Sequence, residues 1–144
     1  MSRRIVFALV AMIAMLAGAA TAADASTGGV KVSKIHYAQT GTKLNTEYIV
    51  FKNKTAHSRS IGGWKITSAP SSDHQFYVFP KTKIPAGGTV TLYTGSGNNS
   101  PGKRYWDAAS PRWNNDGDKA VLKNASGTTV DTCRYAGGGT TAYC

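Results

Sequence analysis

Residues 112–122 read RWNNDGDKAVL, and this stretch decides the class of fold. A tryptophan, Trp113, leads into a run of turn-forming residues, and Asp118 then opens a strand in which apolar residues alternate. Asn, Asp and Gly tolerate left-handed backbone and hydrogen-bond to their own main chain, so the run predicts a tight turn between two strands. We expect Trp113 to anchor this turn in an apolar core.

A calcium loop is the alternative interpretation of residues 114–118, because oxygen-bearing side chains alternate there around a glycine. The acidic residues are too few for such a loop, and no glutamate follows at the spacing that a bidentate ligand requires. Arg112 and Lys119 flank the segment and would repel a cation. We therefore interpret it as an architectural turn in which Asp118 accepts hydrogen bonds from backbone amides, and we predict no metal site.

The rest of the chain has the pattern of a β-protein. Apolar residues recur mostly at every second position, and Gly, Asn, Ser and Pro interrupt them at strand-like intervals. The pattern predicts strands over residues 30–38, 46–52, 75–79, 89–94, 104–107, 119–123 and 128–135, and a short one carrying Trp64 and Ile66. About seven to nine short strands without helices predict a single-domain antiparallel β-sandwich.

Residues 1–25 are predicted to be a signal peptide and to lie outside the fold. Two arginines precede an apolar run over residues 5–16, and small-residue A-x-A sites end at Ala22 and at Ala25. The run is shorter than the roughly 20 residues of a membrane span, and no second apolar segment follows it. We expect cleavage after Ala22 or Ala25, a secreted extracellular protein, and no transmembrane segment in the mature chain.

The two cysteines, Cys133 and Cys144, lie close to the end of the sequence. In an oxidising compartment an even pair indicates a disulfide, and a metal pair would lack further ligands nearby. The closed loop of about a dozen residues would stabilise the fold by about 2–3 kcal/mol on the chain-entropy model. The sequence predicts a Cys133–Cys144 bridge that ties down the glycine-rich tail over residues 136–144.

Four motifs, in the right order, resemble those of the lamin tail domain. Residues 45–53 (NTEYIVFKN) resemble its N-x-E-Y-V-x-L-x-N strand, and residues 61–66 (IGGWKI) are similar to its L-x-G-W-x-L strand. Phe79-Pro80 with residues 84–87 (IPAG) resembles an F-P…L-x-P-G turn, and residues 113–118 match a W-N-N-x-G-D corner. The motif positions of the resemblance include Glu47, Tyr48, Trp64, Trp113, Asn114, Asn115, Gly117 and Asp118.

The resemblance covers residues 29–135 and implies a compact immunoglobulin-like β-sandwich. Such domains occur at the tails of nuclear lamins and in many bacterial exported proteins, alone or beside nucleases and hydrolases. They are regarded as binding or attachment modules with links to nucleic acid, membranes and partner proteins. This sequence looks like a stand-alone bacterial secreted member, and without a rod segment it is not expected to form lamin-like filaments.

Catalytic patterns are weak in this sequence. Glu47 lies beside aromatic residues and could be a general acid with a raised pKa, but a structural hydrogen-bonding role is the favoured interpretation. The three histidines lack zinc-ligand spacing, and Gly95-Ser96-Gly97 lacks the frame of a nucleophile elbow. We predict no catalytic residue, no enzyme activity and no cofactor.

Charge suggests the class of partner. The chain has 17 basic and 7 acidic residues, and removal of the two leader arginines leaves 15 basic ones. Such an excess favours polyanions, although it also keeps a secreted protein soluble. The densest group of basic and aromatic residues consists of Lys103, Arg104, Tyr105, Trp106 and Arg112. We propose it as a candidate site for nucleic acid or an anionic cell-wall polymer.

Two further binding classes remain open. Exposed aromatic side chains could stack on the sugar rings of a polysaccharide, with little dependence on salt. A protruding loop such as Ser68 to His74 could bind a protein in an adhesion or inhibitor module. The oligomeric state is not predicted from the sequence.

Overall fold

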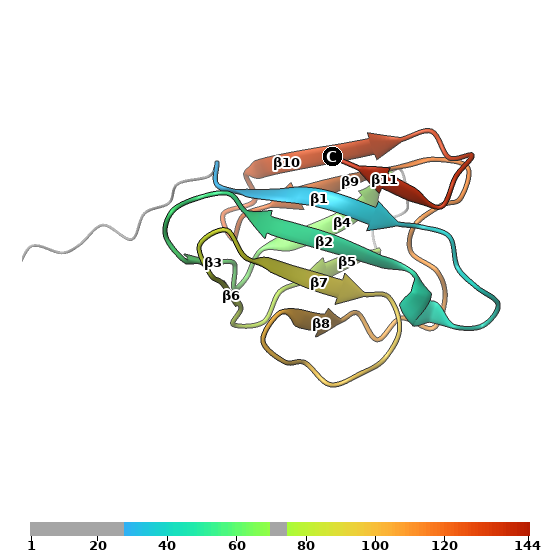
Figure 1. The fold of residues 1–144 in the computed structure, drawn as a ribbon, viewed down its shortest axis with the longest axis horizontal. Coiled ribbons are helices and arrows are strands. Elements are labelled where there is room, and N and C mark those ends of the chain that lie inside the picture. The colour runs from blue at the N-terminus through green and yellow to red at the C-terminus, as the bar shows by residue number, and fades with distance from the viewer. Residues whose placement is uncertain (1–27, 70–74) are drawn as a thin grey trace, which may run out of the picture.

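The computed structural model describes residues 28–69 and 75–144, which form two facing sheets and a small two-stranded ribbon (Figure 1). The larger sheet has the spatial order β11 (Thr141–Tyr143), β1 (Val30–His36), β2 (Tyr48–Asn53), β7 (Thr89–Tyr93) and β8 (Lys103–Tyr105). The second sheet has the order β10 (Thr129–Tyr135), β9 (Asp118–Lys123), β4 (Lys65–Ala69) and β5 (Phe76–Val78). The predicted β-sandwich is confirmed.

Strand pairing is antiparallel throughout the two large sheets with one exception. β7 and β8 are parallel neighbours, and Thr91 pairs with Lys103 and Tyr93 with Tyr105. The loop 94–102 joins the two strands, and Gly102 adopts a φ of +79° just before β8 begins. A prediction of a purely antiparallel sandwich is therefore wrong at this one pair, because alternation along a strand carries no information about its direction.

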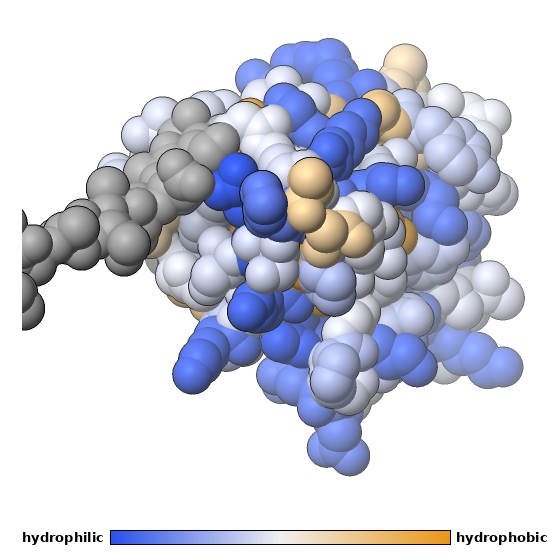
Figure 2. Space-filling model, turned by 60° about the vertical axis from the view of Figure 1, so that its left-hand side comes forward, coloured by the Kyte–Doolittle hydropathy of each residue, from blue (hydrophilic) through white to orange (hydrophobic). Residues whose placement is uncertain are grey.

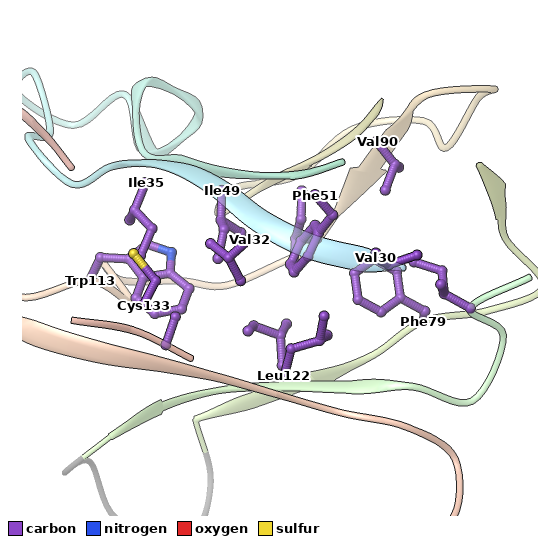
Figure 3. Close-up of a cluster of buried hydrophobic side chains, with 14 of the residues drawn as sticks. Val30, Val32, Ile35, Ile49, Phe51, Phe79, Val90, Trp113, Leu122 and Cys133 are labelled. Carbon is purple, nitrogen blue, oxygen red and sulfur yellow. The ribbon is translucent and has the colours of Figure 1, made fainter. Parts of the chain in front are cut away.

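The core forms between the inner faces of the two sheets (Figure 3). Ile35, Ile49 and Phe51 from the larger sheet are completely buried, as is Leu122 from the smaller one. Trp113 is 2% exposed and belongs to the same cluster, so the turn after it is anchored in the core. The alternation of buried and partly exposed positions along β1, β2 and β9 is the period of two expected of a half-buried strand.

Several short elements have no counterpart in the predicted pattern. β3 (Arg59–Ser60) pairs with β6 (Lys83–Ile84), and the 3₁₀ turn η1 (Leu44–Thr46) precedes β2. Such short elements have no period to detect. Within the described ranges there is no α-helix, and none of the helical segments is long and apolar enough to cross a membrane.

The disulfide between Cys133 and Cys144 is confirmed, and it connects β10 to the segment that follows β11. β11 extends the larger sheet by pairing with β1, where His36 faces Thr141 and Lys34 faces Tyr143. The main-chain N–H of Cys144 also donates to the Ser33 carbonyl at 3.1 Å. The bridge therefore joins the edges of the two sheets, and the tail contains a strand that the sequence pattern does not predict.

Several sequence predictions fall outside the described residues. The predicted signal peptide, with cleavage expected after Ala22 or Ala25, lies there, and so does most of the loop from Ser68 to His74.

Candidate binding surface

The Glu47 carboxylate is turned inward at the start of β2 and is fully buried. Its Oε1 accepts hydrogen bonds from the Thr94 hydroxyl and from the main-chain N–H of Arg112, both at 2.6 Å. Burial raises the pKa of this carboxyl above its usual range, and the hydrogen bonds and the Arg112 charge counter only part of that shift. Glu47 thus links β2, the end of β7 and the approach to Trp113.

Asp118 is also buried, at the end of the turn that follows Trp113. Its Oδ1 accepts from the main-chain N–H of Lys119 at 2.6 Å, and its Oδ2 accepts from the Ser68 hydroxyl at 2.7 Å and from the Asn114 N–H at 3.2 Å. Both oxygens are therefore engaged in holding the turn against β4. Within the described part of the chain, no group of three or more His, Cys, Asp or Glu side chains could hold a metal ion.

Asp131 lies at the seam between the two sheets. It accepts from the main-chain N–H of Val32 at 2.8 Å and lies 3.4 Å from the Lys31 ammonium. The other described carboxylates, Asp107 and Asp116, are exposed in loops. Among the described residues, neither solvent-facing surface of the sandwich therefore carries a carboxylate.

The outer face of the five-stranded sheet carries two neighbouring rows of side chains. The aromatic row, defined here as His36, Tyr48, Tyr93 and Tyr105, crosses four adjacent strands through directly paired positions. The lysine row is defined as Lys34, Val50, Thr91 and Lys103 and is named for the lysines at its two ends. It crosses the same four strands, two residues away from the aromatic row on each strand. Lys52 lies beyond it and is exposed. This face is cationic and aromatic.

The rings of the aromatic row pack against one another. His36 and Tyr48 are stacked with centroids 5.2 Å apart, and Tyr93 and Tyr105 are stacked at 5.3 Å. The Lys34 ammonium lies 5.1 Å from the Tyr48 centroid, within the range of a cation–π contact. Cross-strand pairs of this kind stabilise a sheet by about 0.2–1 kcal/mol each, so packing accounts for part of this row.

The structure divides the predicted site among different surroundings. Lys103 and Tyr105 point outward and belong to the two rows. Arg104 points inward and is 9% exposed, and its guanidinium donates to the Thr82 hydroxyl at 2.9 Å and to the Ser100 carbonyl at 2.6 Å. Trp106 packs on the core, and the Arg112 guanidinium lies 5.9 Å from its ring centroid. Only two of the five residues thus share one outer face.

The outer face of the four-stranded sheet is also free of carboxylates among the described residues. Its strands carry Lys65, Lys119, Lys123 and Arg134 at positions that are at least partly exposed. Phe76 and Val78 on β5 are 40% and 46% exposed, and the Lys65 ammonium lies 4.5 Å from the Phe76 ring centroid. On the face in Figure 2, hydrophobic side chains form only small patches among hydrophilic ones.

Two open grooves of the described surface do not gather catalytic groups. The groove beside η1, with a volume of about 540 Å³, is lined by residues 42–46, Gly95, Ser96 and Ala108, none of which is an acid or a histidine. The groove between β1 and β10 has a volume of about 260 Å³ and contains Asp131, which is already bonded to Val32. No arrangement of acid, base and nucleophile is found in these grooves.

The fold defines the class of the protein, an immunoglobulin-like β-sandwich. The model of the Lamin Tail Domain family matches residues 23–137, and the chain belongs to that family. The family consists of binding domains and is not known for enzymatic activity. No match to this chain is found among curated proteins.

Of the aromatic row, only Tyr105 belongs to the site predicted from the sequence. The four members of the row lie far apart in the chain, on four different strands, and only the register of the sheet brings them together. The sequence does indicate that Tyr48 and Tyr93 point outward, because each lies between buried positions in the alternating pattern of its strand.

Proposed function

We propose that this protein is an exported, non-catalytic binding module whose partner is a polyanion, such as extracellular nucleic acid or an anionic cell-wall polymer. The observation that supports it is the outer face of the five-stranded sheet, which carries Lys34, Lys52 and Lys103 and, among the described residues, no carboxylate. The acidic side chains that the structure describes are buried, bonded at the seam, or placed in loops.

The physical basis is the release of counterions. A surface that neutralises phosphates with lysines releases the cations condensed on the polymer, so binding weakens steeply as salt rises. Three lysines correspond to a slope of about −2 in log K against log salt for a single-stranded chain. A polysaccharide without charge would show no such slope.

A protein partner is the second candidate, and the exposed Phe76 and Val78 on β5 favour it. Apolar side chains at a sheet edge are typical of surfaces that pair with another chain. Stacking on neutral sugar rings has less support, because the ring faces of Tyr93 and Tyr105 are turned toward each other.

Binding of the purified protein to DNA, to an anionic wall polymer and to a neutral glycan, measured over a salt series, tests the proposal. We expect salt-dependent binding to the two polyanions and none to the glycan. A Lys34→Gln/Lys52→Gln/Lys103→Gln variant should lose this binding. The matched control, Lys65→Gln/Lys119→Gln/Lys123→Gln, removes the same charge from the opposite face and should retain most of it. Equal losses in the two variants would contradict a site on the five-stranded sheet.

A further inference from the structure

The tyrosine hydroxyls of the aromatic row differ from those of Tyr37 and Tyr135. The Tyr37 hydroxyl accepts from the Gly139 N–H at 3.0 Å, and the Tyr135 hydroxyl donates to the Asn114 carbonyl at 2.8 Å. Within the described residues, the hydroxyls of Tyr48, Tyr93 and Tyr105 have no hydrogen-bond partner and are not buried. They are therefore available to a ligand.

The ring faces of the same row are covered. Tyr93 and Tyr105 stack at an interplanar angle of 21°, and His36 and Tyr48 at 8°. On the Tyr105 ring the loop 94–102 closes in, since a Cβ on Gly97 would lie only 2.3 Å from a ring carbon. A nucleobase or sugar that stacked on these rings would first have to separate them. The row consequently presents hydroxyl-bearing edges to solvent.

The lysine row runs beside these edges. Two residues along a strand amount to roughly 7 Å, and three gaps between adjacent strands to roughly 14 Å. The face thus holds two parallel lines of donors, hydroxyls on one side and the Lys34 and Lys103 ammonium groups on the other. A single extended chain of phosphodiesters laid across the strands would receive donors from both lines.

Proteins that bind single-stranded nucleic acid commonly stack successive bases on aromatic faces, and those of the aromatic row are covered. Tyr143, which is 81% exposed and pairs with Lys34 on the same face, is a single open ring and provides no platform for successive bases. The hydroxyl and ammonium donors of this face suit phosphate oxygens. From these contacts we infer that the partner is a base-free polyol-phosphate chain of the cell-wall type, bound through the hydroxyls of Tyr48, Tyr93 and Tyr105 together with the flanking lysines. The inference rests on the proposed function and specifies the ligand of the same face.

The test compares poly(glycerol phosphate) with a dT oligonucleotide of equal phosphate number, using the whole purified protein. We expect the polyol-phosphate chain to bind at least as tightly as the oligonucleotide. A Tyr48→Phe/Tyr93→Phe/Tyr105→Phe variant keeps the stacked rings and removes the hydroxyls, so its affinity should fall at least roughly tenfold. The control Thr67→Val/Thr129→Val/Thr132→Val, on the four-stranded sheet, should bind like the parent. Unfolding midpoints of both variants check that they are folded.

The outcomes separate the two proposals. If binding depends on salt and on Lys34, Lys52 and Lys103 but is unchanged by the Tyr→Phe substitutions, the hydroxyl contacts are refuted and the proposed function stands. If the oligonucleotide binds tenfold more tightly, its bases contribute and nucleic acid is the partner instead. If neither polymer binds, both the inference and the proposed function are overturned.

Discussion

The Glu47 carboxylate accepts a 2.6 Å hydrogen bond from the main-chain N–H of Arg112, a residue 65 positions further along the chain. This bond joins the residue just before β2 to the segment that precedes Trp113 in the core. The same carboxylate oxygen also receives the Thr94 hydroxyl. Glu47, which the sequence allows as a catalytic acid, therefore connects three segments of the chain: its own, the one at Thr94 and the one at Arg112.

Removal of the Glu47 junction should destabilise the domain. Glu47→Ala leaves the Thr94 hydroxyl and the Arg112 N–H buried without an acceptor, which costs about 1–3 kcal/mol for each group. Urea unfolding followed by fluorescence measures the change. Glu47→Gln retains one acceptor oxygen and should cost less than Glu47→Ala, whereas equal stability of all three proteins would show that the junction is not structural.

The free energy of unfolding should depend on pH through the protonation of Glu47. Because burial raises its pKa in the folded state, the protonated carboxyl is the form that the fold favours. The stabilisation that the protonated Glu47 carboxyl contributes is fully present below 4.5, the pKa of the carboxyl in the unfolded chain. This stabilisation is lost as the pH rises through the higher pKa of the folded state. The stability difference between the parent protein and Glu47→Gln should therefore shrink as pH rises, measured by urea unfolding at a series of pH values. A difference that grows with pH would contradict the raised pKa.

Calcium should leave the thermal midpoint of the protein unchanged. Both Asp118 oxygens already accept hydrogen bonds from groups of the fold, and a cation would have to displace them. Differential scanning calorimetry with calcium or with a chelator checks this. A midpoint that rises with calcium and no longer rises in Asp118→Asn would establish a calcium site at the turn.

Arg104 should matter for stability and Lys103 for binding. Arg104→Met removes charged hydrogen bonds that connect Thr82, Ser100 and the start of β8, and it should destabilise the fold by about 2–3 kcal/mol. Lys103→Gln, one residue away on the outward face, should leave stability within about 0.5 kcal/mol. Unfolding and polyanion binding are measured on both variants. A Lys103→Gln variant that binds like the parent, together with a folded Arg104→Met variant that loses binding, would exclude the proposed face.

Loss of the disulfide should release β11 before the rest of the sandwich. A Cys133→Ser/Cys144→Ser variant should lose about 2–3 kcal/mol of stability. Hydrogen exchange should show faster exchange at Thr141 and Tyr143, while amides of β2 keep their protection relative to global unfolding. Uniform acceleration across the sheet would indicate instead that the bridge stabilises the domain as one unit.

Part of this fold could be predicted from the sequence because the relevant patterns are local. The period of two along β2 and β9, and the turn formers between Trp113 and Asp118, act through neighbouring residues. β11 could not be predicted, since its three residues lack alternation and form a strand only against the edge of β1. Arg104 and Lys103 look equivalent in the sequence, and only the register of β8 against β7, which pairs Arg104 with the buried Leu92, determines which of them faces solvent.

The sandwich, the family resemblance, the Cys133–Cys144 pair and the excess of positive charge can be predicted from the amino-acid sequence, because these depend on local pattern and composition. Where that charge lies depends on the folded chain. It buries Glu47 and Asp118, holds Asp131 at the seam, and aligns Tyr48, Tyr93 and Tyr105 across neighbouring strands. Register and burial are properties of contacts between distant segments, and for that reason the candidate surface becomes visible only once the sheets are formed.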